Sequence, residues 1–496
     1  MRTIKIIITS VIIAVYMGIS VYAEDIVRIG IKDNVQEAGF GKGAFEVGYD
    51  GGNKEFVKCG EISGDDIEVK ILNGSFTEIG SGYDSYDKAA QICNENEYPA
   101  IVNGKWCVYS MGGDVKTTDC AVGVYDGGVL IMIANSDDDL QMKRKGNNFT
   151  EVDGVQYRGV IETYRNGEVM NIINFIDVEE YLYGVLPSEM TSSWDKEALK
   201  AQAVAARTYR MKNSGIHDQS GYDLCCTTHC QAYKGVELED EKSTQAVDDT
   251  KGEMIYYQGE LINAMYFSSS GGYTANSEDV LGSEVPYLRG VEDKYEKESK
   301  EWERKFTLSQ LTQMTSGIGN VMGLLAKTDE KTGRVNEITL VGMNGDKTIK
   351  NEQIRTFFSS FGGMLESRNF TVNIGGNGGS DKYDGDEAVF VIGDGSKKSI
   401  DIGKLYLENG EKIQNGEEIK IVGSSGEIYI SAGSGKEKKN EKTADESNFS
   451  PDVIILKGRG AGHGIGMSQY GAKGMAESGY DYKEILKYYY TGVEVR

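Results

Sequence analysis

Alternating hydrophobic and polar positions characterise the first third of the chain after its N-terminal segment. Residues 27–31 and 67–71 carry apolar side chains at every second position. A period of two predicts half-buried β-strands, and the glycines between such runs predict turns. Residues 86–109 predict a helix followed by a strand. We therefore expect residues 24–158 to form a β-rich module, whose ligand the pattern does not identify.

The spacing of apolar residues changes to a helical one near residue 177. Asp177 begins a capping box, apolar positions follow at helical spacing as far as Leu186, and Pro187 predicts the end of this helix. A second helix is predicted from near Ser193. Its Ala-rich run, residues 198–206, would let a neighbouring element approach closely.

The rest of the chain predicts a core interrupted by an insertion. Residues 253–270 predict a hairpin that turns at Gln258-Gly259, and residues 301–370 a mixture of helices and strands. Residues 371–450 contain short strands between Gly-rich runs and end in a charged linker, after which an apolar strand resumes at 453. The predicted fold class is α+β, with helices packed on antiparallel or mixed sheets. Its core comprises residues 159–370 and 451–496, and 371–450 is a β-rich insertion.

The N-terminal segment predicts export. Arg2 and Lys5 precede an apolar stretch over residues 6–19, and Val21-Tyr22-Ala23 supplies a small-x-small cleavage box. Residues 1–23 are therefore predicted to be a secretory signal, with a retained anchor as the alternative. No later stretch of the sequence is long and apolar enough to span a bilayer. We expect an extracytoplasmic protein at the cell wall, with membrane contact only through this segment.

Composition excludes several classes of function. The 496 residues include 53 Lys+Arg and 77 Asp+Glu, a formal net charge of −24. Nucleic-acid binding relies on clustered Lys and Arg, which the sequence lacks. Hydrophobic residues make up 39% of the chain, enough for packed cores but too few for a protein that crosses the membrane many times.

Seven cysteines fall into two groups. Four lie early in the chain, where an exported protein can form disulfides in any of three pairings: Cys59, Cys93, Cys107 and Cys120. The other three cysteines, Cys225, Cys226 and Cys230, lie close in sequence to His217 and His229. This pattern is typical of a metal site. Soft S/N ligands in so short a span suit tetrahedral zinc. Four ligands would make a closed structural site, and three would leave a position for water. Unliganded thiols are the alternative.

Two other positions are candidates for chemistry. Apolar neighbours around Glu189 would raise its pKa by desolvation, as a general acid requires, although a helix-capping role also fits its position. Glycines alternate around His463 in residues 458–466 without forming a dinucleotide-binding pattern, and predict close backbone approach with positive φ. His463 itself fits a loop-fixing role. The serines of 268–272 lack the pattern of a nucleophile elbow.

Five segments in order resemble the stage II sporulation protein D/amidase-enhancer family: Asn174–Met190, Glu197–Tyr209, His229–Tyr233, Tyr266–Gly272 and Gly460–Ala472. The resemblance covers residues 160–370 and 451–496. It implies a peptidoglycan lytic transglycosylase that acts in engulfment during sporulation. Such an enzyme cleaves the bond between N-acetylmuramic acid and N-acetylglucosamine and forms a 1,6-anhydro product. Some family members stimulate a cell-wall amidase, so a non-catalytic peptidoglycan-binding enhancer is the alternative.

The resemblance also implies roles for individual residues. Glu189 matches the catalytic acid/base, and Arg207 a functional arginine that would hold Glu189 or an anionic group of the glycan. Sugar-binding positions would be Tyr209, Tyr233, Gln469 and Tyr470. Structural zinc would be held by His217, Cys225, His229 and Cys230, with Cys225 favoured over Cys226. Implied partners are glycan strands, a cell-wall amidase and other engulfment proteins. The N-terminal module and the insertion lie outside the matched segments, which leaves open a vegetative paralogue.

Overall fold

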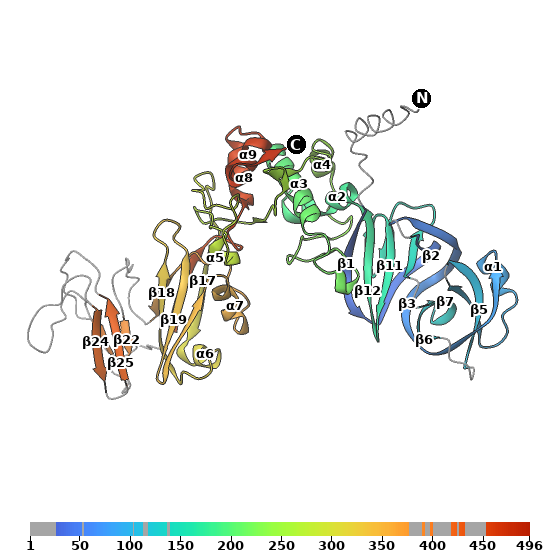
Figure 1. The fold of residues 1–496 in the computed structure, drawn as a ribbon, viewed down its shortest axis with the longest axis horizontal. Coiled ribbons are helices and arrows are strands. Elements are labelled where there is room, and N and C mark those ends of the chain that lie inside the picture. The colour runs from blue at the N-terminus through green and yellow to red at the C-terminus, as the bar shows by residue number, and fades with distance from the viewer. Residues whose placement is uncertain are drawn as a thin grey trace, which may run out of the picture. The chain divides into compact units, whose positions relative to one another are not determined.

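The computed structural model describes residues 26–51, 54–102, 104–112, 118–135, 139–375 and 453–496, with four short strands between the last two ranges. The predicted signal segment, residues 1–23, and the charged linker at 436–442 lie outside the described residues. The chain forms two units, Met1–Met254 and Ile255–Arg496, each treated by itself below. Helices and sheets are mixed in both, so the predicted α+β class is confirmed (Figure 1). No helix in the described part of the chain is long and apolar enough to cross a membrane.

The first unit is built on a sheet of eleven strands in the order β13-β1-β12-β11-β8-β2-β3-β5-β4-β7-β6. These are β1 (Ile26–Val35), β2 (Glu37–Asp50), β3 (Phe56–Tyr83), β4 (Glu97–Val102), β5 (Lys105–Met111), β6 (Thr118–Asp126), β7 (Val129–Asn135), β8 (Leu140–Arg144), β11 (Val160–Asn166), β12 (Val169–Asp177) and β13 (Leu224–Cys225). A separate hairpin joins β9 (Thr150–Val152) to β10 (Val155–Tyr157).

Five of these strands close on themselves. β6 pairs with β3 as well as with β7, so β3, β5, β4, β7 and β6 form a ring of paired strands. The long β3 makes this possible because its second half pairs with β6 on one side and β5 on the other. The short helix α1 (Tyr86–Ala90) precedes β4, and the core inside includes Phe76, Cys107 and Ile133. The closed ring leaves no exposed edge.

The remaining strands of the sheet carry the helices of the first unit. α2 (Val178–Glu189), α3 (Lys196–Lys212) and α4 (Glu241–Asp248) follow β12, and a 3₁₀ turn, η1 (Asp218–Ser220), precedes β13. β1 pairs antiparallel with β12 and parallel with β13. The N-terminal strand is thus hydrogen-bonded on both edges by strands beyond residue 158. Residues on both sides of the predicted boundary at 158 therefore lie in the same unit.

Local signals around α2 and α3 are only partly as predicted. The Asp177 side chain accepts hydrogen bonds from the backbone N–H groups of Glu179 and Glu180, which is the N-cap half of the predicted capping box. Pro187, however, lies inside α2, which continues to Glu189. The proline lies in the last turn of the helix, where the Ser188 hydroxyl donates to the Gly184 carbonyl (2.7 Å). The alanines of α3 are wholly buried, consistent with close packing.

The described part of the second unit contains three three-stranded sheets and three two-stranded ones. β17 (Glu301–Thr307), β26 (Val453–Arg459) and β21 (Phe370–Gly375) form one; β18 (Val321–Thr328), β19 (Val335–Gly342) and β20 (Gly345–Lys350) a second; and β15 (Glu260–Leu261), β14 (Ile255–Tyr257) and β28 (Glu494–Val495) a third. The first two share a core that includes Phe306, Ile338 and Leu456. The short β16 (Tyr266–Phe267) pairs with β27 (Met467–Ser468). The helical elements are α5 (Glu278–Leu281), α6 (Leu308–Gln313), α7 (Gln353–Phe357), η2 (Phe358–Ser360), α8 (Gln469–Glu477) and α9 (Tyr482–Tyr489).

Two predictions concern this unit directly. The predicted turn at Gln258-Gly259 joins β14 to β15, and both residues have positive φ, 52° and 88°. β21 and β26 are neighbours in one sheet, so the chain between them leaves and re-enters at adjacent strands; the insertion at 371–450 stays a prediction. Within that segment the structure describes two hairpins, β22 (Val389–Val391) with β23 (Lys397–Ser399) and β24 (Glu418–Gly423) with β25 (Gly426–Ser431).

Candidate functional site

Glu189 is the last residue of α2 and is half-buried. Its Oε1 atom accepts a hydrogen bond from the backbone N–H of Ala232, at 2.8 Å. The carboxylate therefore lies at a helix end, with its orientation set by a segment 43 residues further along the chain. An oriented, partly exposed carboxylate can give a proton to a bound substrate and take one back.

The segment from His229 to Tyr233 lies tightly against α2 and α3. The Gln231 side chain is wholly buried: its Oε1 accepts from the Tyr181 hydroxyl (3.2 Å) and its Nε2 donates to the Ala206 carbonyl (3.1 Å). The chain passes so close to α2 that only glycine fits at 184. A Cβ there would lie 2.4 Å from the Gly235 carbonyl oxygen and 2.6 Å from the Tyr233 ring. Residues 229–233 are thus fixed to the two helices on either side of Glu189.

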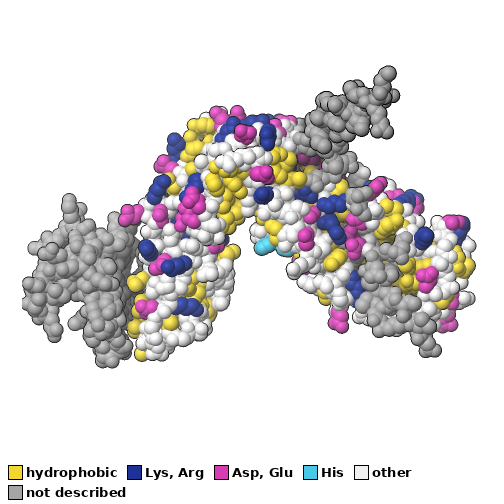
Figure 2. Space-filling view, viewed as in Figure 1, with side chains coloured by type: hydrophobic (Ala, Val, Ile, Leu, Met, Phe, Trp, Pro, Cys, Tyr) yellow, Lys and Arg dark blue, Asp and Glu magenta, His cyan; other side chains and the backbone are white. Residues whose placement is uncertain are grey.

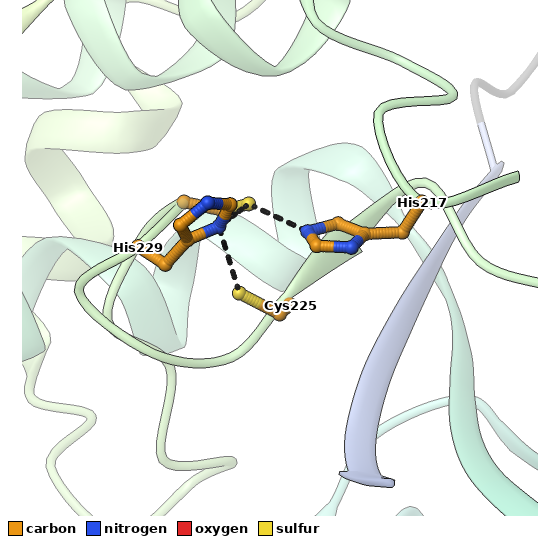
Figure 3. A group of neighbouring side chains, drawn as sticks. His217, Cys225 and His229 are labelled. Carbon is orange, nitrogen blue, oxygen red and sulfur yellow. Dashed lines mark hydrogen bonds between the residues drawn. The ribbon is translucent and has the colours of Figure 1, made fainter. Parts of the chain in front are cut away.

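The structure brings His217, Cys225, His229 and Cys230 together (Figure 3). One ligand atom of each lies within 4.8 Å of the others. The distances are 3.3 Å from His217 Nε2 to Cys230 Sγ, 3.7 Å from Cys225 Sγ to His229 Nδ1, and 3.3 Å from Cys230 Sγ to His229 Nδ1. Ligand atoms 2.0–2.3 Å from a tetrahedral zinc ion are separated by about 3.3–3.8 Å. Donor types and spacing both fit zinc.

Cys226 does not join this cluster. Its Sγ lies 3.7 Å from the Ile31 carbonyl oxygen, on the β1 side, and burial raises the pKa of its thiol. Cys225 ends β13 and faces the histidines, and its hydrogen bond with Cys230 lowers the pKa of its own thiol. The alternation of side chains along a strand explains why neighbouring cysteines face opposite ways. His229 is exposed, and histidine atoms reach the surface in the space-filling view (Figure 2).

Arg207 does not contact Glu189 in the described contacts. Its guanidinium makes a two-pronged ion pair with Glu179, at 2.8 and 2.6 Å, and donates to the carbonyls of Glu253 and Val247. The arginine is only 2% exposed. This geometry corrects the expectation that Arg207 holds Glu189: the arginine is buried against the first turn of α2, away from its last residue.

The expected sugar-binding residues lie in different environments. Tyr233 is buried, donates its hydroxyl to Asn174 (2.8 Å) and packs on Tyr181, so its ring is a core residue and not an exposed sugar platform. Tyr209 is half-buried, and burial together with the nearby Cys230 and Cys225 raises its pKa to about 12. Gln469 and Tyr470 begin α8 in the second unit, where Gln469 is buried and Tyr470 exposed.

The motifs at 266–272 and 460–472 pack on each other within the second unit. β16 pairs with β27, and Ser269 bridges to Ala461. The alternate glycines of the second motif all have positive φ, between 78° and 110°, as predicted. His463 Nδ1 accepts from the Ile465 N–H, and burial lowers the pKa of this imidazole to about 4. His463 therefore fixes the loop, as expected.

The structure describes the side chains of three of the four early cysteines. Cys59, Cys93 and Cys107 are unbonded to one another, and each lies near a backbone carbonyl. The side chain of Cys120 lies outside the described residues. The pairing of the four early cysteines stays undecided.

Comparison with known proteins follows the same segments. A model of the Stage II sporulation protein family matches residues 166–257. An uncharacterized protein of Brachyspira hyodysenteriae is 30% identical over 384 residues, which cover 75% of this chain and 78% of the relative. Stage II sporulation protein D of Bacillus subtilis is 28% identical over 344 residues, covering 64% and 74%. This chain belongs to the stage II sporulation protein D family. A further Bacillus subtilis relative, named amidase enhancer, is 32% identical over 313 residues, but the chain spans only 39% of its length.

In this member of the stage II sporulation protein D family, three contributors to the site had no assigned role in the sequence analysis. Glu179 is the partner of Arg207, Gln231 joins α2 to α3, and Ala232 orients Glu189. Gln231 and Ala232 belong to the segment His229–Tyr233 that resembles the family, and their place beside the two ligands was the sequence signal that could have identified them. No local pattern pairs Glu179 with Arg207, because the pair forms only when two helices pack.

Proposed function

We propose that this protein is an exported peptidoglycan lytic transglycosylase with Glu189 as its acid/base. Family membership and the names of the relatives support the coarser role, a function at the cell wall in sporulation. The N-terminal segment with Arg2 and Lys5 supports export. Sequencing the N-terminus of protein recovered from the cell-wall fraction tests whether residues 1–23 are removed.

One carboxyl group is enough for the proposed reaction. Protonated Glu189 gives its proton to the oxygen that links N-acetylmuramic acid to N-acetylglucosamine, and the bond from that oxygen to the muramyl C1 breaks. The acetamido oxygen of the same sugar stabilises the cationic centre. Ionised Glu189 then takes the proton of the muramyl C6 hydroxyl, while the oxygen of that hydroxyl bonds to C1. The products are a 1,6-anhydro-muramyl end and a free N-acetylglucosamine end, and no water is consumed.

The observation that carries this proposal is the oriented Glu189 carboxylate at the end of α2, held by the Ala232 N–H. The test is digestion of glycan strands, with and without stem peptides, followed by mass spectrometry. Wild type is expected to release 1,6-anhydro products and Glu189→Gln to release none. Glu180→Gln is the matched control. Glu180 lies on the same helix, and its carboxylate makes a long ion pair with Arg158, at 3.8 Å. Equal release by wild type and Glu189→Gln would refute the proposal.

A non-catalytic enhancer is the second candidate, because one relative is named amidase enhancer. Under it the protein binds peptidoglycan and stimulates a cell-wall amidase. Glu189→Gln would then leave both binding and stimulation unchanged, and no anhydro product would appear with wild type.

Zinc is the proposed cofactor, held by His217, Cys225, His229 and Cys230. The four donors fill a tetrahedral shell, so the ion would supply a structural cross-link between β13 and the loops around it. A zinc content near one ion per chain, measured by mass spectrometry of the metal, is expected. A reaction that stops on chelation while the fold is unchanged would instead indicate a catalytic metal.

A further inference from the structure

A very short segment, residues 230–232, joins the four-ligand cluster to the backbone N–H that holds the Glu189 carboxylate. Cys230 is a proposed ligand, Gln231 is locked between α2 and α3, and the N–H of Ala232 holds the Glu189 carboxylate. A single residue, Gln231, therefore separates a metal ligand from the residue whose N–H orients the carboxylate. We infer that metal binding positions Glu189 through this segment, with Gln231 as a positioning residue. The inference rests on the proposed zinc site and the proposed role of Glu189.

Each link in this path has a described contact. On the metal side, His229 and Cys230 are adjacent ligands, so the peptide between them is held at both ends. In the middle, Gln231 is wholly buried and uses both ends of its amide. Beyond it, the Tyr233 N–H donates to the Cys226 carbonyl at 3.0 Å and the Tyr233 hydroxyl to Asn174. A segment fixed at this many points has little freedom to move its Ala232 N–H independently of the metal.

Coupling of this kind is reciprocal. If bound metal favours the conformation in which Ala232 holds Glu189, then the Glu189–Ala232 hydrogen bond must favour metal binding by the same factor. The effect can therefore be read in metal affinity without any measurement of cleavage. Glu189→Ala removes the acceptor, whereas Glu189→Gln keeps an oxygen that Ala232 can donate to.

The experiment measures zinc affinity of the full chain by competition with a chelator. Glu189→Ala and Gln231→Met are expected to bind zinc about five-fold or more weakly than wild type, and Glu189→Gln within about two-fold of it. Gln141→Met is the matched control. Gln141 is a wholly buried glutamine of the same unit with one hydrogen bond, to Glu162, and none described to α2, α3 or residues 229–233. Its variant is expected to bind zinc as wild type does.

A second measurement needs no variant. Hydrogen exchange of wild type with and without zinc is expected to show slower exchange of the Ala232 amide, and of the amides of residues 188–190, in the zinc-bound form. Equal zinc affinity in wild type, Glu189→Ala and Gln231→Met, or unchanged exchange at Ala232, would overturn the inference while leaving the cleavage assay to judge the function. Absence of zinc binding overturns the inference and the cofactor proposal together. Loss of cleavage in Glu189→Gln with normal zinc affinity supports both the reaction and the separation of the two roles.

Discussion

Replacing Arg207 tests whether this arginine stabilises the fold or binds substrate. Its guanidinium is 2% exposed and makes two charge-assisted bonds to Glu179, with two more to backbone carbonyls. Arg207→Met leaves the Glu179 carboxylate buried without its counter-ion. Breaking a buried pair on one side costs about 3–5 kcal/mol in the free energy of unfolding. For a unit of this size, that is a fall of about 6–20 °C in the midpoint of its thermal transition.

The double variant Arg207→Met/Glu179→Leu makes the reasoning refutable. Because it removes both charges and replaces them with apolar groups, most of the lost stability should return. Thermal unfolding of the two single variants and the double variant forms a double-mutant cycle, and binding to glycan strands is measured in parallel. A single variant with wild-type stability but lost glycan binding would refute the structural role. So would a double variant no more stable than Arg207→Met.

Three other perturbations follow from described contacts. Cys225→Ser should weaken zinc affinity by more than about 100-fold, because even residues that only hydrogen-bond to metal ligands contribute about 10–100-fold. Cys226→Ser should bind zinc as wild type does, and equal losses in the two variants, measured by chelator competition, would contradict the assignment of Cys225. Gly184→Ala should lower the free energy of unfolding by about 1–3 kcal/mol, because its Cβ would overlap the Tyr233 ring; an unchanged urea midpoint would oppose this. For His463, whose pKa is lowered to about 4, the unfolded chain takes up a proton from near pH 6.5 while the folded chain does not until pH 4. The neutral, buried His463 thus contributes at most about 3 kcal/mol to the free energy of unfolding, fully above pH 6.5 and no longer once the pH has fallen to 4. The thermal midpoint of wild type should therefore fall over this pH range more than the midpoint of His463→Gln does.

Short-range patterns predicted the local structure around Glu189 well. The cap at Asp177, the Ala-rich helix and the turn at Gln258-Gly259 all depend on residues within a few positions of one another, and each occurs as expected. Pro187 shows the limit of such rules. The helix α2 continues two residues beyond this proline, so the local rule alone does not decide where the helix ends.

Contacts between distant segments were beyond the reach of sequence patterns. The pairing of β1 with β12 and β13 places the N-terminal strand beside the strands that precede α2 and the metal-ligand cluster, and no local feature of Ile26–Val35 indicates it. Tyr233 could serve equally as a core ring or as an exposed sugar platform, and only the approach of its segment to α2 decides for the core.

By itself, the sequence identified the candidate groups: one carboxylate at the end of an apolar helix, and two histidines with cysteines at ligand spacing. It could do so because chemistry depends on residue type and on spacing along one stretch of chain. Only the tertiary structure decided which groups meet. It turned Arg207 toward Glu179, selected Cys225 over Cys226 for the cluster, and placed the Ala232 N–H on Glu189. The physical reason is that hydrogen bonds and ion pairs act over about 3 Å, and only the packing of α2, α3 and β13 brings such distances about.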